Sequence, residues 1–108
     1  MKGQIIPAIL ALKFQEIEPK VKLIEKKVKT VHLDVMDGKF VPNKISWSLA
    51  RLKNRRWKPA LSVHLMVKNP EKWVKPCADI KAANAIIHFE SLTEKNLVQI
   101  VKEASRLK

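Results

Sequence analysis

The sequence has 108 residues, 46% of them hydrophobic and 30% charged, which predicts a single soluble globular domain over residues 1–108 and excludes a disordered chain. Only two glycines are present, which excludes a Gly-rich phosphate loop. The net charge of +12 is carried by lysines spread along the chain, so a solvated basic surface is expected and nucleic-acid binding is the minor alternative. The single cysteine, Cys77, excludes an intramolecular disulfide and favours a cytoplasmic location, and no apolar run is long enough to span a membrane.

Apolar segments and helical segments alternate along the first half of the chain. A strand is expected at 4–9, followed by a helix at 19–29 that starts with a proline in its first turn. The next strand is expected at 31–36. The dipeptide Asp37-Gly38 then predicts a turn of mainly structural importance, and a short helix is expected around 47–53.

The same alternation continues after a third strand, which is expected at 61–67. Asn69-Pro70 is typical of a helix start, and the helix it predicts carries Cys77 as a core residue without a catalytic partner. Pro76 lies inside this segment, so we expect the helix to kink or restart there.

The last predicted unit consists of a strand at 85–89 and a helix capped by Thr93. The apolar stripe of that helix is predicted to comprise Leu97, Ile100, Val101, Ala104 and Leu107. Four βα units in succession imply an α/β fold with a parallel sheet and right-handed crossovers. If the sheet curls as a barrel does, the first and fourth strands are left as edges.

Polar side chains recur on one face of the second and third predicted strands. Because side chains alternate with period two, His32, Asp34 and Met36 share one face, and His64 and Met66 share the corresponding face of the next strand. The opposite faces are apolar and are formed by Val31, Leu33, Val35, Leu61, Val63 and Leu65. The apolar row is expected to face the helices, and the polar row to face inward.

An inward-facing aspartate beside two histidines is costly unless something pairs with them. A divalent metal held by His32, Asp34 and His64 would satisfy all three and leave positions open for a substrate. The alternative is that each histidine is a core residue bonded to a backbone carbonyl; the convergence of all three favours the metal. His88 has the parity to join this face, and we expect it to support the ligands rather than bind the metal.

Four segments resemble motifs of the ribulose-phosphate 3-epimerase family. The run VHLDVMDG at 31–38, continued by FVPN at 40–43, resembles the family signature. The segment VHLMV at 63–67 resembles its second motif, IPAIL at 6–10 its opening strand, and HFE at 88–90 its fourth strand. The segments occur in the family's order over essentially the whole chain, which corresponds to about half of a usual member.

The resemblance implies the N-terminal half of a (βα)8 TIM barrel, with the site at the carboxyl ends of the strands. It implies interconversion of D-ribulose 5-phosphate and D-xylulose 5-phosphate in the pentose phosphate pathway. His32, Asp34 and His64 would bind Zn²⁺ or Fe²⁺, or alternatively Mn²⁺ or Co²⁺, and Asp34 would also be one of two acid–base aspartates. Met36 and Met66 would line the substrate pocket.

The chain also departs from the family pattern. Ala8 replaces the serine that contacts substrate, and the second acid–base aspartate and the phosphate-binding amides belong to later strands. We therefore expect a truncated or incomplete epimerase with little activity as a monomer. One alternative is a half-barrel that pairs with a second copy as a homo-oligomer. Another is a non-catalytic protein that binds phosphorylated ligands or RNA through its basic surface.

Overall fold

The structure, a computed structural model, contains one parallel sheet and describes residues 5–88, 90 and 92–106. The strands are β1 (Ala8–Ile9), β2 (Thr30–Met36), β3 (Ala60–Met66) and β4 (Asn84–Ile87), and they lie in the order β1-β2-β3-β4. All neighbouring pairs are parallel, as predicted. The strand order leaves β1 and β4 as the edge strands, which was also predicted. This is the arrangement of the N-terminal half of a (βα)8 barrel, which confirms the predicted fold class.

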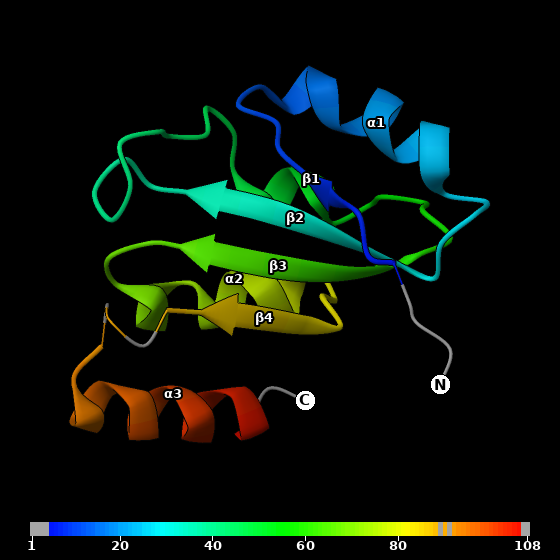
Figure 1. The fold of residues 1–108 in the computed structure, drawn as a ribbon. Helices are drawn as coiled ribbons and strands as arrows, with labels where there is room; N and C mark the ends of the chain where they lie inside the picture. The colour runs from blue at the N-terminus through cyan, green and yellow to red at the C-terminus, as the bar shows by residue number, and fades with distance from the viewer. Residues whose placement is uncertain (1–4, 89, 91, 107–108) are drawn as a thin grey trace.

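Helical segments connect the strands and cover one side of the sheet. They are the 3₁₀ helix η1 (Phe14–Glu16), α1 (Ile17–Ile24), the 3₁₀ helices η2 (Leu49–Leu52) and η3 (Pro70–Lys72), α2 (Val74–Asp79) and α3 (Glu94–Arg106). In Figure 1, α2 lies behind the sheet, while α1 and α3 flank its two edges. No helix in the described part of the chain is long and apolar enough to cross a membrane.

The first unit is shorter than the sequence predicts. Of the strand expected at 4–9, only Ala8–Ile9 forms a strand among the described residues, and Gln4 lies outside them. The helix expected at 19–29 instead occupies Ile17–Ile24, because η1 leads directly into it and its end tightens into turns. Pro19 does lie in the first turn, where its missing N–H has no helical partner to lose.

The connections after β2 and β3 also differ from the prediction. The short helix expected at 47–53 is a single 3₁₀ turn. The segment after β3 begins as η3 and restarts as α2 at Val74, so Pro76 falls in the first turn of α2 and introduces no kink. The strand expected at 85–89 is β4, four residues long, and Phe89 lies outside the described residues.

The last helix begins as predicted but buries less of its apolar stripe. The hydroxyl of Thr93 accepts a hydrogen bond of 3.2 Å from the backbone N–H three residues later, which caps the helix. Ile100 is buried, whereas Val101 and Ala104 are exposed, and Leu107 lies outside the described residues. The stripe is incomplete because α3 sits beside the edge strand β4 and covers little of the sheet.

The core lies between the helices and the apolar face of β2 and β3. All six side chains of the predicted apolar row are buried, namely Val31, Leu33, Val35, Leu61, Val63 and Leu65. His32, Asp34 and His64 are only partly buried on the other face. The two faces therefore separate as the alternation predicted, with apolar side chains towards the helices and polar side chains on the open face.

The turn after β2 depends on a glycine. Gly38 has φ +77°, and a Cβ at this position would lie 3.2 Å from Cβ of Lys44. Gly38→Ala should therefore lower the free energy of unfolding by about 1–2 kcal/mol, because a side chain is strained in the left-handed region. Urea denaturation would measure this loss. Gly38→Asn should lose less, because asparagine tolerates that region; equal losses would assign the cost to the contact with Lys44 instead.

Candidate metal centre

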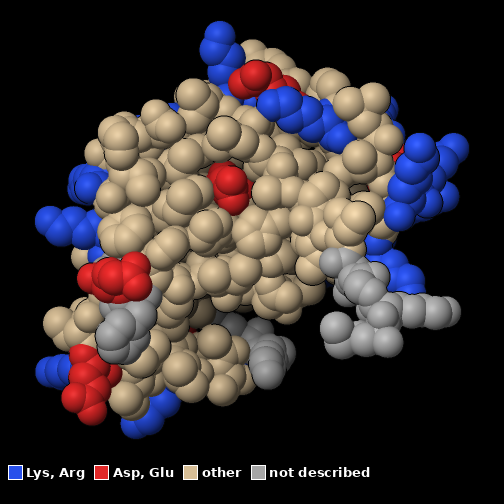
Figure 2. All heavy atoms as spheres, in the orientation of Figure 1, with Lys and Arg blue, Asp and Glu red and all other residues tan. Residues whose placement is uncertain are grey.

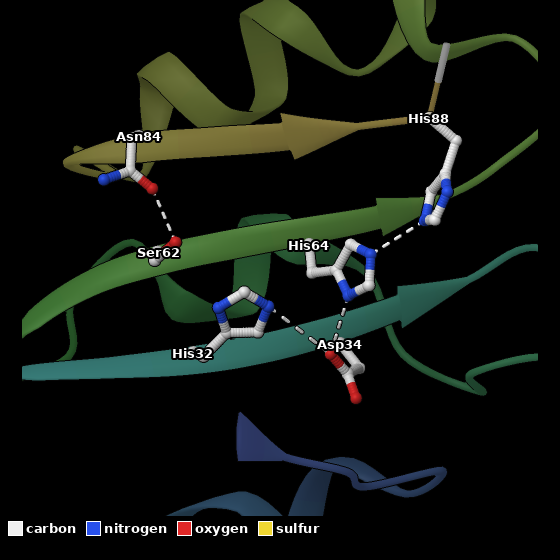
Figure 3. A network of polar contacts seen from close by, with 6 residues as sticks. All are labelled: His32, Asp34, Ser62, His64, Asn84 and His88. Atoms are coloured by element: carbon white, nitrogen blue, oxygen red, sulfur yellow. Dashed lines mark hydrogen bonds and ion pairs between the residues drawn. The ribbon is translucent and has the colours of Figure 1, made fainter. Parts of the chain in front are cut away.

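Two adjacent strands bring three metal-binding side chains together on the open face of the sheet (Figure 3). Asp34 of β2 is directly paired with His64 of β3, and His32 lies two residues before Asp34 on the same face. Nδ1 of His64 lies 3.2 Å from Oδ1 of Asp34, and Nε2 of His32 lies 3.7 Å from the same oxygen. The strand register alone places these groups around one carboxylate.

These side chains form a group that could hold a metal ion. One ligand atom from each of His32, Asp34 and His64 lies within 4.8 Å of the others. Two imidazoles and a carboxylate form a donor set that suits Zn²⁺ and Fe²⁺ and leaves coordination positions for other ligands. The side chains are partly buried, so the group is accessible from the open face. The residues present therefore fit a divalent metal.

The expected supporting residue, His88, contacts one member of the group. Its Nε2 lies 2.8 Å from Nε2 of His64, and the two ring centroids are 4.9 Å apart, so the rings meet edge to edge through these nitrogens. On the other side, Nδ1 of His88 lies 3.5 Å from Oε2 of Glu90. His88 thus reaches the group through His64, and it is not among the three residues that could share an ion.

The predicted substrate-lining positions lie on the same side of the sheet. Met36 and Met66 are paired in register at the carboxyl ends of β2 and β3. Ala8 of β1 is paired with His32, and it is exposed. The structure thus brings together every residue that the sequence proposed for this site. The roles assigned to Met36, Met66 and Ala8 stay predictions.

Sequence reasoning missed a polar pair further along the same face. The hydroxyl of Ser62 on β3 donates to the side-chain oxygen of Asn84 on β4, and Ser62 is buried. Parity places Ser62 on the face of His64, but the register with β4 was needed to find its partner Asn84. This bond gives the buried hydroxyl of Ser62 a hydrogen-bond partner.

Sequence reasoning also missed a basic pocket at the carboxyl end of the sheet. The pocket has a volume of ≈ 310 Å³, and Lys39, Lys44 and Lys72 line it together with Met36. Lys39 and Lys44 come from the loop after β2, and Lys72 is the last residue of η3 after β3, so the pocket joins two segments that are far apart in the sequence. The sequence did contain an indication of this pocket, because the segments that carry these lysines directly follow the two strands of the metal-binding group.

Asp37 organises the loop after β2, as its turn sequence predicted. Its Oδ1 accepts hydrogen bonds from the N–H groups of Lys39 and Phe40, and its Oδ2 accepts one from Lys68. Burial raises the pKa of Asp37, but the N–H groups of Lys68, Phe40 and Lys39 outweigh it and the pKa is lowered below 3.8. The carboxylate ties the loops after β2 and β3 to each other.

The shifted pKa of Asp37 predicts a pH-dependent contribution to stability. A carboxyl with a lowered folded-state pKa stabilises the fold above its unfolded pKa of 3.8, and this contribution disappears as pH falls through the folded pKa. Asp37→Asn should therefore lower the free energy of unfolding at pH 7 and flatten its decline below pH 4. Urea denaturation over a pH series measures both effects. A variant whose decline matches that of the unsubstituted chain would show that Asp37 contributes nothing.

Cys77 lies in the core, as the sequence suggested, and Trp47 also has a structural role. Burial raises the pKa of the Cys77 thiol to about 11, so the thiol stays protonated at neutral pH and is no nucleophile. Trp47 is buried in the core, and its indole N–H donates a 2.9 Å bond to the carbonyl of Ala11. This bond anchors the loop after β2 to the chain that follows β1.

Comparison with known proteins gives one consistent family. A family model described as "Ribulose-phosphate 3 epimerase family" matches residues 4–107. The chain is 33% identical to the ribulose-phosphate 3-epimerase of Candida glabrata, covering 95% of the chain and 50% of the relative. It is 30% identical to the cytoplasmic isoform from Oryza sativa subsp. japonica, covering 93% of the chain and 46% of the relative. The Synechocystis enzyme is 34% identical, covering 80% and 38%.

Proposed function

This chain belongs to the ribulose-phosphate 3-epimerase family, and on that premise we propose that its site serves the metal-dependent 3-epimerisation of D-ribulose 5-phosphate to D-xylulose 5-phosphate in the pentose phosphate pathway. The observation that carries the proposal is the convergence of His32, Asp34 and His64 on the open face of the sheet. The chain spans about half the length of the curated relatives it matches. We place it in the cytoplasm, in line with the rice relative, which is named as a cytoplasmic isoform.

Nε2 of His32, Oδ1 of Asp34 and Nδ1 of His64 are the atoms that would hold the metal, for which we propose Zn²⁺ or Fe²⁺. When bound, such an ion supplies Lewis-acid polarisation of the sugar carbonyl, which makes the neighbouring C–H more acidic. Both histidines approach the same carboxylate oxygen of Asp34. The carboxylate of Asp34 therefore places a negative charge between the two histidines, where it would stabilise a bound divalent cation.

Asp34 is the proposed acid–base residue of this chain. Epimerisation requires removal of the C3 proton from one side of the carbon and its return from the other. Among the residues of β2 and β3, Asp34 is the one carboxylate on the open face. We propose that Asp34 serves one side of the substrate. A second acid–base group must then serve the opposite side.

The surroundings of the group favour a phosphorylated substrate. Figure 2 shows the open face with lysine and arginine mostly at its rim, where some aspartate and glutamate also lie, and few lysines or arginines near its centre. Lys39, Lys44 and Lys72 add positive charge in the pocket next to Met36. A basic rim raises the local concentration of an anionic substrate without having to bind it specifically. Met36 and Met66 would provide apolar contacts beside the reacting carbons.

Exchange of the C3 hydrogen of D-ribulose 5-phosphate with D₂O tests this proposal on the chain as it is. Exchange needs only one base, whereas inversion to D-xylulose 5-phosphate needs two groups. Measuring exchange and product formation separately therefore distinguishes the proposed role of Asp34 from the complete reaction. With Zn²⁺ or Fe²⁺ present, we expect the C3 proton signal to disappear faster than in the metal-free sample. Asp34→Asn should abolish this acceleration, and Asp79→Asn, on the surface of α2, should leave it unchanged.

Absence of metal-dependent exchange, together with absence of metal binding, would contradict the proposed function. Formation of D-xylulose 5-phosphate in the same samples would show that the chain also assembles the second acid–base group. Salt-sensitive binding of RNA or of the sugar phosphate without any exchange would instead indicate a binding protein that uses its basic surface.

A further inference from the structure

We propose that His88, supported by Glu90, is a positioning residue that holds His64 in the tautomer that presents Nδ1 as a metal ligand. The inference rests on the proposed metal centre and assigns a role to residues that do not touch the metal. Figure 3 shows His64 between Asp34 and His88, with a contact at each ring nitrogen. The imidazole is therefore fixed from two sides.

The two contacts of His64 determine the orientation of its ring. Nδ1 lies 3.2 Å from Oδ1 of Asp34, and Nε2 lies 2.8 Å from Nε2 of His88. The centroid of the His88 ring in turn lies 5.1 Å from the centroid of the Phe40 ring, which packs against it. A rotation of His64 that moved Nδ1 away from the metal-binding group would break the contact with His88.

Hydrogen-bond accounting then fixes the direction of the bond between the histidines. A neutral imidazole has one N–H donor and one lone-pair acceptor, so one of the two Nε2 atoms must donate and the other must accept. A nitrogen that binds a metal offers its lone pair, which leaves the proton of His64 on Nε2. His64 therefore donates to His88 when the metal is bound.

The acceptor role of His88 places its own proton on Nδ1. That nitrogen lies 3.5 Å from Oε2 of Glu90, so a carboxylate is near the position where the proton must be. If His88 donated to His64 instead, the proton of His64 would lie on Nδ1, directed at Asp34, and the metal would lose a ligand. The interaction with Glu90 favours the productive tautomer, although its exposed side chain limits the strength.

Zn²⁺ affinity of the 108-residue chain, measured by competition with a chromophoric chelator, tests the role of His88. His88→Leu removes the acceptor and should weaken Zn²⁺ binding about 10–100-fold, the usual effect of losing a residue that orients a metal-binding histidine. His88→Gln carries an amide oxygen that can accept from His64, and it should bind more tightly than His88→Leu. Equal affinity of His88→Leu and the unsubstituted chain would overturn the inference.

The histidine tautomers provide a readout that needs no substitution. In the Zn²⁺-loaded chain, long-range ¹H–¹⁵N spectra should show His64 protonated on Nε2 and His88 protonated on Nδ1. A His88 ring protonated on Nε2 would overturn the proposal even if His88→Leu failed to fold. If the unsubstituted chain bound no Zn²⁺, the metal centre itself would fall. If Zn²⁺ bound normally but the tautomers or the affinity of His88→Leu differed from these expectations, only the role of His88 would be refuted.

Discussion

Asp34→Asn should weaken Zn²⁺ binding to this chain by more than about 100-fold. Loss of a group that merely orients a metal ligand typically costs about 10–100-fold in affinity, and Asp34 is proposed to contact the metal directly. Its Oδ1 is the atom approached by both His32 and His64, so the substitution removes the charge at the centre of the group. A neutral amide oxygen is a weaker ligand for a divalent cation.

Two measurements check the loss at Asp34. Chelator competition gives the affinity, and urea denaturation gives the stabilisation by Zn²⁺, which should reach about 2.7 kcal/mol for the unsubstituted chain at a concentration about 100 times Kd. Asp34→Asn should gain almost nothing at that concentration. Asp79→Asn removes a carboxylate that pairs with Lys75 on the surface of α2, and it should behave like the unsubstituted chain. Zn²⁺ stabilisation that survived Asp34→Asn would place the metal elsewhere.

The convergence of His32, Asp34 and His64 could be predicted from the sequence because it depends on the alternation within strands. Side chains two residues apart on a strand must share a face, so His32 and Asp34 could be assigned together from the sequence alone. Consecutive parallel strands in a βα repeat are neighbours, which brought His64 to the same face. The three side chains meet in the folded chain.

Features that depend on long-range contacts could not be predicted in the same way. Val101 has the helical spacing of a buried residue, yet it is exposed because α3 lies beside an edge strand rather than across the sheet. The contact between His64 and His88 required the ring orientations, which strand parity does not determine. By contrast, Pro76 was expected to kink or restart a helix, and the helix does restart close to it, at Val74, so that Pro76 lies in the first turn, where proline is tolerated.

Leu33→Ala should lower the free energy of unfolding by about 2–5 kcal/mol, the usual cost of a cavity left by a leucine in a packed core. Leu33 lies on the central strand β2, is 1% exposed, and packs in the core between the sheet and the helices. Leu23→Ala is the matched control, because Leu23 is 78% exposed and its loss should change the free energy by less than about 0.5 kcal/mol. Urea denaturation with an unchanged m-value would measure both. A similar loss in the two variants would contradict the assignment of the core.

The Leu33 variant also tests whether the two faces of β2 are energetically independent. Leu33 lies between His32 and Asp34 in the chain, but its side chain points to the opposite face of the sheet. If the strand backbone stays in place, saturating Zn²⁺ should stabilise Leu33→Ala and the unsubstituted chain equally. An increment smaller by more than about 0.5 kcal/mol would exceed the scatter expected for independent sites. It would show that the packing behind β2 helps to hold the ligands in position, which makes the core part of the metal centre.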